Sequence, residues 1–267
     1  MKIVVVLRQT VDLAEELELT DEGTDIEREY LTFKLNEWDE QALEEALLLA
    51  EETGGEVSVL ALDEPEVDQS LYTALAKGAA RAVKLTGLPA TPIWSYARAA
   101  ILAAHLRGVE FDLLLTGVQT PEDLDGQIGG ILAGLLGLPH ASASVGVRAD
   151  GDAVSISQEL AGGVIHELSI SGAPAVIGVQ TARRAPGYVP VARIRAAMAG
   201  GAIETVAAAG RESDGVAAAV TVRRMYAPQS STHAEMLAGD GDAVAQRIVE
   251  IIAERGVLRG RSEGGAL

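Results

Sequence analysis

Apolar residues in the first half of the chain follow two alternating patterns. Short, mostly apolar runs are typical of strands buried on both faces of a sheet, and they occupy residues 3–7, 57–62, 82–85 and 112–116. The stretches between them have helical character, over residues 36–53, 68–77, 92–106 and 127–136. Asn36 is predicted to cap the first helix through its side chain. This alternation predicts an α/β fold with a doubly wound, mostly parallel sheet.

The polar stretch 12–33 interrupts this alternation, and we expect it to leave the sheet edge as an excursion, such as a hairpin. Apolar and polar residues alternate on either side of Ala161-Gly162-Gly163, which predicts a hairpin over residues 153–170. Residues 175–179 read as a further strand.

The remaining residues predict a C-terminal extension. Residues 200–215 are small and polar, as in a linker, and 220–224 read as a short strand. Residues 243–255 form an amphipathic pattern with Val244, Ile248, Ile251 and Ile252 on one side. We therefore expect an α/β domain over 1–199, a C-terminal arm over 200–258 and a disordered tail over 259–267.

Composition narrows the possible functions of the 267 residues. A formal net charge of −18 disfavours nucleic acid as a partner, because it repels phosphate backbones. The absence of cysteine excludes disulfides and thiolate metal sites, and it fits a cytoplasmic protein. The apolar runs fall short of the roughly 20 residues of a membrane helix, and the start of the chain lacks a secretory pattern, so we expect no membrane insertion.

The glycine- and aspartate-rich segment 116–129 carries the strongest candidate chemistry. It follows a predicted parallel strand and leads into a helix, where open α/β sheets bind ligands and helix N-termini attract phosphate. Glu122, Asp123 and Asp125 would repel phosphate unless they point away. An ordinary acidic loop is the alternative, because the segment has neither a Walker nor a GxGxxG motif.

No catalytic constellation is evident in the sequence. Ser142 and Ser144 lie near His140, but we interpret them as part of a solvated turn. Trp38 is interpreted as a packing anchor or as an aromatic neighbour of a flavin. These features favour a carrier or binding role over catalysis.

Several segments together resemble the beta subunits of electron-transfer flavoproteins, including the FixA-type branch. The segments fall in the family's order along the chain: VVVLRQTVD (4–12), LNEWDEQALEEA (35–46), TALAKGAARA (73–82), the loop 117–129, LGLP (136–139) and Glu159…Gly162-Gly163. The resemblance implies a fold related to the adenine-nucleotide alpha hydrolases. It also implies an alpha subunit, which the C-terminal arm contacts and which supplies most of a shared FAD site.

The resemblance further implies a nucleotide in this chain, either AMP or, as in electron-bifurcating members, a second FAD. The positions of this sequence that match the family's cofactor-binding residues are Val6, Leu7, Arg8, Asn36, Trp38, Asp39, Leu62, Asp63, Gly117, Val118, Gln119, Thr120, Asp123, Asp125, Gly126, Gln127 and Ile128. Trp38 then matches the family aromatic near the alpha-bound flavin. Glu37, Asp125, Gly126 and Ile128 depart from the usual residues and leave the exact ligand open.

Residues 183–197 are similar to the loop with which the family docks its redox partners. Val191 takes the place of an anchoring leucine, and Arg193, Ile194 and Arg195 follow it. The implied partners are a flavin dehydrogenase, such as an acyl-CoA dehydrogenase, and a quinone reductase or another acceptor. The chain itself would be an electron carrier and not an enzyme.

Two alternatives stay open at this point. One is an electron-bifurcating subunit that oxidises NADH with its own FAD. The other is a nucleotide-binding module of the universal-stress type, which would bind ATP as a homodimer.

Overall fold

The computed structural model describes residues 1–88, 94–122, 126–172, 174–201, 203–208, 222–227, 234 and 236–256. The chain divides into two units, Met1–Met225 and Tyr226–Leu267, each of which is considered by itself.

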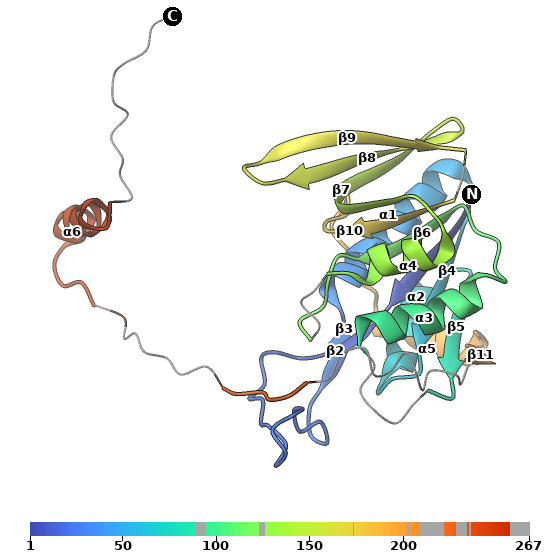
Figure 1. Ribbon diagram of the computed structural model, residues 1–267, viewed down its shortest axis with the longest axis horizontal. Helices are drawn as coiled ribbons and strands as arrows, with labels where there is room; N and C mark the ends of the chain where they lie inside the picture. Colours follow the sequence, from blue (N-terminus) through green and yellow to red (C-terminus); the bar gives the residue numbers. More distant parts are fainter. Residues whose placement is uncertain are drawn as a thin grey trace, which may run out of the picture. The chain divides into compact units, whose positions relative to one another are not determined.

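A nine-stranded sheet forms the centre of the first unit, in the order β11-β5-β4-β1-β6-β10-β7-β8-β9 (Figure 1). The strands from β11 to β7 are parallel, and β8 and β9 are antiparallel to their neighbours. The predicted α/β class with a mostly parallel sheet is confirmed. The predicted central strands are present as β1 (Lys2–Leu7), β4 (Glu56–Leu62), β5 (Arg81–Thr86), β6 (Leu113–Gly117) and β10 (Ala175–Val179).

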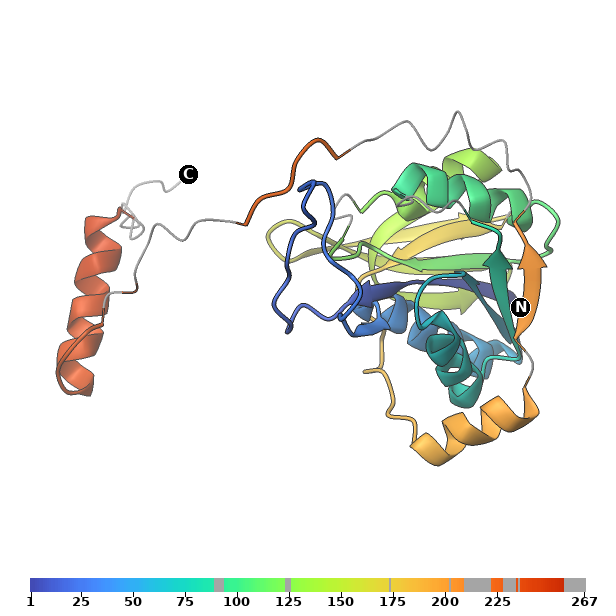
Figure 2. The ribbon, with the colours of Figure 1, turned by 90° about the horizontal axis from the view of Figure 1, so that it is seen from below.

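Helices cover both faces of the sheet. On one face lie α1 (Glu37–Thr53) and α2 (Val67–Lys77), and on the other lie α3 (Ser95–Leu106) and α4 (Ile128–Leu136) (Figure 2). The sequence of β1 is continuously apolar because the strand is buried on both faces of the sheet. Ile3, Val5 and Leu7 join the core under α1 and α2, whereas Val4 and Val6 join the core under α3 and α4.

The hairpin predicted around Ala161-Gly162-Gly163 is present as β8 (Ala153–Leu160) and β9 (Val164–Ser171). It continues the sheet through β7 (His140–Asp150), which pairs with β10 and β8. The interpretation of Ser142 and Ser144 as a solvated turn is therefore wrong, because both lie in β7 and Ser144 is fully buried.

Residues 12–33 leave the sheet, as expected. They lie between β2 (Gln9–Val11) and β3 (Phe33–Leu35), which pair antiparallel in a separate two-stranded ribbon. A bridge between Leu19 and Ile26 closes the excursion, and the amide of Met225 donates to the carbonyl of Gly23 over 2.7 Å.

Three expectations for the C-terminal third need correction. Residues 191–197 of the expected docking loop lie in helix α5 (Val191–Gly200), which packs against α2 (Figure 2). Within the expected linker, β11 (Glu204–Ala207) adds a parallel edge strand to the sheet beside β5. Residues 222–224 of the expected strand 220–224 are not a strand, and 220–221 lie outside the described residues.

In the second unit, the predicted amphipathic helix is present as α6 (Gly241–Glu254). Asp240 caps it by accepting a hydrogen bond from the amide of Ala243 over 2.9 Å. The expected tail 259–267 lies outside the described residues. Within the ranges given above, no helix combines the length and the apolarity needed to cross a membrane.

Candidate functional site

The carboxyl ends of β4, β1 and β6 lie side by side, because these three strands are neighbours in the sheet. Arg8 follows β1, Asp63 follows β4, and Gly117 ends β6. Helices α1 and α4 begin at this same edge, so their free N–H groups also face it. The topology thus gathers segments that are far apart in the sequence.

Asp39 joins two of these strand ends from the first turn of α1. One carboxylate oxygen accepts from the amide of Arg8 and the other from the amide of Gly117, each over 2.9 Å. Burial raises the pKa of Asp39 to about 7, although hydrogen bonds from Asn36, Gly117 and Arg8 oppose that shift. A Cβ on Gly117 would lie 2.8 Å from the main-chain nitrogen of Asp39, so only glycine permits this approach.

Asn36 precedes α1 and is fully buried. Its side chain does not cap the helix, which corrects the expectation from sequence. Instead, Nδ2 donates to the carbonyl of Gln119 over 2.9 Å and ties α1 to the loop after β6. Among the described residues, its Oδ1 has no hydrogen-bond partner. An orphaned acceptor of this kind fits a ligand that brings a donor.

The loop after β6 carries an acidic side chain whose charge is neutralised within the protein. Glu122 accepts hydrogen bonds from Arg8 and from Arg28, each over 3.0 Å. Arg8 also donates to Thr120 Oγ1 over 2.8 Å. Glu122 is therefore turned away from the loop amides, which answers the objection that it would repel phosphate. Asp123 and Asp125 lie outside the described residues.

A small cavity of about 20 Å³ lies at the centre of these contacts. Its lining includes most of the predicted residues, namely Val6, Arg8, Asp39, Gly117, Gln119, Thr120, Gly126, Gln127 and Ile128. Two residues that the sequence reasoning missed complete it, Arg98 from α3 and Thr116 from β6. The available signal for Arg98 was a charged residue within the otherwise apolar stretch 97–104.

The cavity and its surroundings fit a phosphoryl group by their chemistry. The beginning of α4 contributes positive potential, and the lining arginines Arg8 and Arg98, which pair with Glu122 and Glu64, supply further N–H groups. Thr116 Oγ1 is buried and has no partner among the described residues, so it can donate to a ligand oxygen. The enclosed volume is close to that of one water molecule. A single phosphate oxygen could occupy this cavity, and the rest of a nucleotide would have to lie outside it.

A larger hollow of about 470 Å³ adjoins the cavity and shares Arg8 with it. Apolar side chains from β2, from the excursion and from the segment between β5 and α3 supply part of its wall, and Asp63, Glu64 and Arg28 supply polar groups. The apolar side chains are Val11, Leu13, Leu17, Ile26, Phe33, Leu88 and Trp94.

The remaining predicted cofactor residues lie at the same edge but outside the cavity lining. Leu7 and Leu62 end β1 and β4 and are buried. Trp38 is half-buried in the first turn of α1, and Val118 is half-buried after β6.

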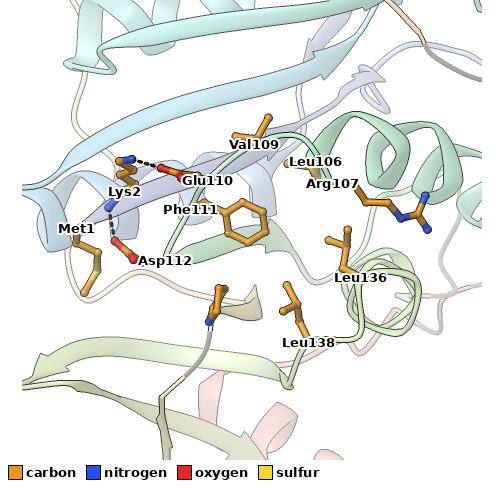
Figure 3. A pocket seen from close by; sticks show the side chains of 11 residues that line it. Met1, Lys2, Leu106, Arg107, Val109, Glu110, Phe111, Asp112, Leu136 and Leu138 are labelled. Carbon is orange, nitrogen blue, oxygen red and sulfur yellow. Dashed lines mark hydrogen bonds and ion pairs between the residues drawn. The ribbon is translucent and has the colours of Figure 1, made fainter.

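A hollow of about 700 Å³ lies at the opposite, amino edge of the sheet (Figure 3). Leu106, Phe111 and Leu138 line its wall, and Lys2 there pairs with Glu110 and donates its amide to Asp112. Helices α3 and α4 end at this edge, so neither directs its N-terminus at the hollow. In this respect it differs from the carboxyl edge, where α4 begins.

The predicted docking residues lie on α5, away from the cavity lining. Val191, Arg193 and Arg195 are exposed, whereas Ile194 is half-buried. Tyr188, directly before the helix, is also exposed. Among the described residues, no group of histidine, aspartate and glutamate could hold a metal ion.

Comparison with known proteins identifies the family. The model of the electron transfer flavoprotein domain matches residues 24–211. The beta subunit of an electron transfer flavoprotein from Methylophilus methylotrophus is 34% identical over 264 residues, which cover 95% of this chain and 98% of that protein. A beta subunit from Clostridium acetobutylicum is 32% identical over 73% of this chain and 74% of its own. A mitochondrial beta subunit from Oryza sativa subsp. japonica is 32% identical over 73% of this chain and 77% of its own. This chain therefore belongs to the electron transfer flavoprotein family, and the relatives that it matches are beta subunits.

Proposed function

We propose that this chain is the beta subunit of a cytoplasmic, heterodimeric electron-transfer flavoprotein. It pairs with an alpha subunit, shares one FAD with it and holds AMP at the carboxyl edge of its own sheet. The complex accepts electrons from a flavin dehydrogenase, such as an acyl-CoA dehydrogenase, and passes them to a quinone reductase or another acceptor. The family match favours this reading over a module of the universal-stress type.

One observation carries the proposal: a cavity with the chemistry of an anion site lies where β4, β1 and β6 end. The amides at the start of α4, together with Arg8 and Arg98, would hold the phosphate. The hydroxyl of Thr116 would donate a further hydrogen bond to a phosphate oxygen, and the buried acceptor of Asn36 would receive one from a donor elsewhere on the nucleotide, such as a ribose hydroxyl.

The bound FAD would supply the electron-carrying chemistry, and the protein would bind, orient and tune it. Trp38 stands in the first turn of α1 and would pack beside the alpha-bound flavin, where it would exclude water. Asp39 holds that turn against Arg8 and Gly117, and so fixes the place of the indole.

A second FAD in place of AMP is the alternative ligand. The hollow of about 470 Å³ beside the cavity favours it, because apolar side chains and polar groups together line a space next to the phosphate position. A second flavin would make the complex a bifurcating carrier that oxidises NADH.

Co-expression with an alpha subunit from the same genome tests both the complex with AMP and the complex with a second FAD. The absorption spectrum and the nucleotides released on denaturation give the count of each ligand per heterodimer. One FAD and one AMP support the proposal, and two FAD support the alternative. A colourless complex that releases no adenosine phosphate contradicts both.

A pair of glycine variants locates the nucleotide. Gly126→Ala should lower the nucleotide content, because Gly126 has a φ of +61° and its Cβ would lie 3.0 Å from the carbonyl of Val118. Gly130→Ala is the control, because its Cβ would make only ordinary contacts with His140. Equal nucleotide content in the two variants would argue against binding at this loop.

A further inference from the structure

Two adjacent acidic side chains of α1 face the segment that leads into α5. Glu45 is fully buried, and 3% of Glu44 is exposed. Residues 183 and 184 are both arginines, and they begin the predicted docking segment 183–197. This part of α1 belongs to neither the cavity nor the hollow described above.

Glu45 contacts both the side chain and the main chain of Arg183. One oxygen accepts from Arg183 Nε over 2.7 Å, and the other accepts from the Arg183 amide over 2.8 Å. The first oxygen also accepts from the amide of Val147 in β7 over 2.7 Å. The carboxylate thus joins the segment to the sheet through three N–H groups.

Glu44 likewise contacts an arginine side chain and a main-chain amide of the same segment. It accepts from Arg184 Nε over 2.7 Å and from the amide of Gly187 over 3.2 Å. Lys77 of α2 lies 3.9 Å from the same carboxylate. Within the described part of the chain, residues 183–189 make no hydrogen bond from backbone to backbone, so these carboxylates supply the main-chain contacts of the segment.

The outer part of α1 provides a natural comparison. Glu52 and Glu51 pair with the same two arginines, but their side chains are 46% and 62% exposed and contact only guanidinium nitrogens. The inner pair is buried and binds amides. Exposed pairs of this kind contribute little, whereas buried charge-assisted bonds to the main chain fix a conformation.

We propose that Glu44 and Glu45 are positioning residues, which set the path of residues 183–190 and thereby the place of α5 for a redox partner. The inference rests on the proposed function, in which α5 docks that partner. Because α1 also carries Trp38 and Asp39, one helix holds both the cofactor edge and the docking segment. Arg183 and Arg184 are paired with glutamates of α1, whereas Arg193 and Arg195 of α5 face solvent.

The test compares Glu44→Gln and Glu45→Gln with Glu51→Gln and Glu52→Gln in the co-expressed heterodimer. A glutamine side chain at position 45 keeps one acceptor oxygen. Its NH₂ group cannot accept a hydrogen bond, so a main-chain amide loses its acceptor. Hydrogen exchange of residues 183–200, followed by mass spectrometry, should become about tenfold faster in the inner variants. The outer variants should stay within about twofold of wild type.

The kinetic readout uses an acyl-CoA dehydrogenase charged with its acyl-CoA as the electron donor. In the inner variants, the KM for the heterodimer should rise about fivefold, while kcat, flavin content and the flavin spectrum stay unchanged. Unchanged exchange and KM in both inner variants would overturn the inference. A parallel loss of kcat and flavin would also overturn it, because that result indicates a general structural role.

Two provisions keep the outcome clear. If Glu45→Gln does not yield a folded heterodimer, Glu44→Gln decides the question, because its partner Arg184 is half exposed. If the wild-type complex binds no flavin or takes no electrons from a dehydrogenase, the proposed function fails. The exchange measurement then still decides whether the two carboxylates hold the segment.

Discussion

The two edges of the central sheet use charged residues in opposite ways. At the carboxyl edge, Asp39 is buried and binds two main-chain amides, and Glu122 is held between Arg8 and Arg28. At the amino edge, Lys2 and Glu110 form a pair whose side chains are 62% and 89% exposed. Buried polar groups are costly unless they are fully bonded, so their concentration at one edge indicates a function there. The same strands run to both edges of the sheet. The edges differ in their charged residues because α1 and α4 begin at the carboxyl edge.

Gly117→Ala should give the largest effect, because it separates α1 from the end of β6. The new Cβ would lie 2.8 Å from the main-chain nitrogen of Asp39 and from the carbonyl carbon of Trp38. We expect a loss of about 3 kcal/mol, measured by thermal unfolding of the co-expressed heterodimer. Gly134→Ala is the control, because its Cβ meets nothing within 4 Å and helix α4 should gain about 0.5 kcal/mol. An unchanged stability of the Gly117→Ala variant would show that this close approach is not required.

Asp39→Asn should lower stability by about 2 kcal/mol, because one of two amides loses its acceptor. Stability should also respond to pH. The pKa of Asp39 in the folded protein is about 7, above its ordinary value of 3.8, so folding takes up a proton between these values. The contribution of Asp39 therefore falls as the pH rises through this window, and the fall should be absent in the variant.

Unfolding curves at several pH values check this prediction. Glu37→Gln is the matched control, because Glu37 lies in the same helical turn with a side chain that is 76% exposed. The same pH slope in wild type and in Asp39→Asn would assign the dependence to another group.

Glu122→Gln should cost about 1.5 kcal/mol, because it weakens charge-assisted bonds between side chains that are mostly buried. Arg8 and Glu122 are 11% and 13% exposed, and Arg28 is 40% exposed, so the loss should be smaller than for a fully buried pair. Nucleotide content should fall with it, because the loop after β6 would lose its tie to the excursion. Full nucleotide content in this variant would place the ligand elsewhere.

Glu110→Gln should have the smallest effect and leave the thermal midpoint unchanged. The hydrogen bond from Lys2 lowers the pKa of Glu110, but both side chains face solvent and exposed pairs contribute little. A loss of stability as large as that of Glu122→Gln would remove the contrast between the two edges.

The elements predicted from sequence are those with strong local signals. Mostly apolar runs predict β1, β4, β5, β6 and β10, because each is buried between two helical layers. Strand β7 lacks a strong local signal, because only Val147 among its buried positions is a large apolar residue. Ser144 lies there beside Ala143, which has a φ of +52°, and the pairing shifts register at this point. Only the neighbouring strands β10 and β8 define such a strand.

The sequence predicts the location of the candidate site, but it does not predict the ion pairs within the site. The carboxyl edge follows from the alternation of strands and helices, and the sequence alone locates the loop after β6. The bonds from Arg28 to Glu122 and from Arg98 to Glu64 join residues far apart in sequence, and no local pattern encodes them. Helix α5 does not follow from the sequence, in which residues 183–197 resemble a docking loop.

Both tryptophans of the chain stand at the carboxyl edge. Trp38 is in the first turn of α1, and Trp94 precedes α3 and lines the hollow. The indole fluorescence of this polypeptide therefore arises entirely beside the place where a ligand is expected. Emission intensity and wavelength give a label-free optical reporter of occupancy, and an added flavin should quench it by energy transfer.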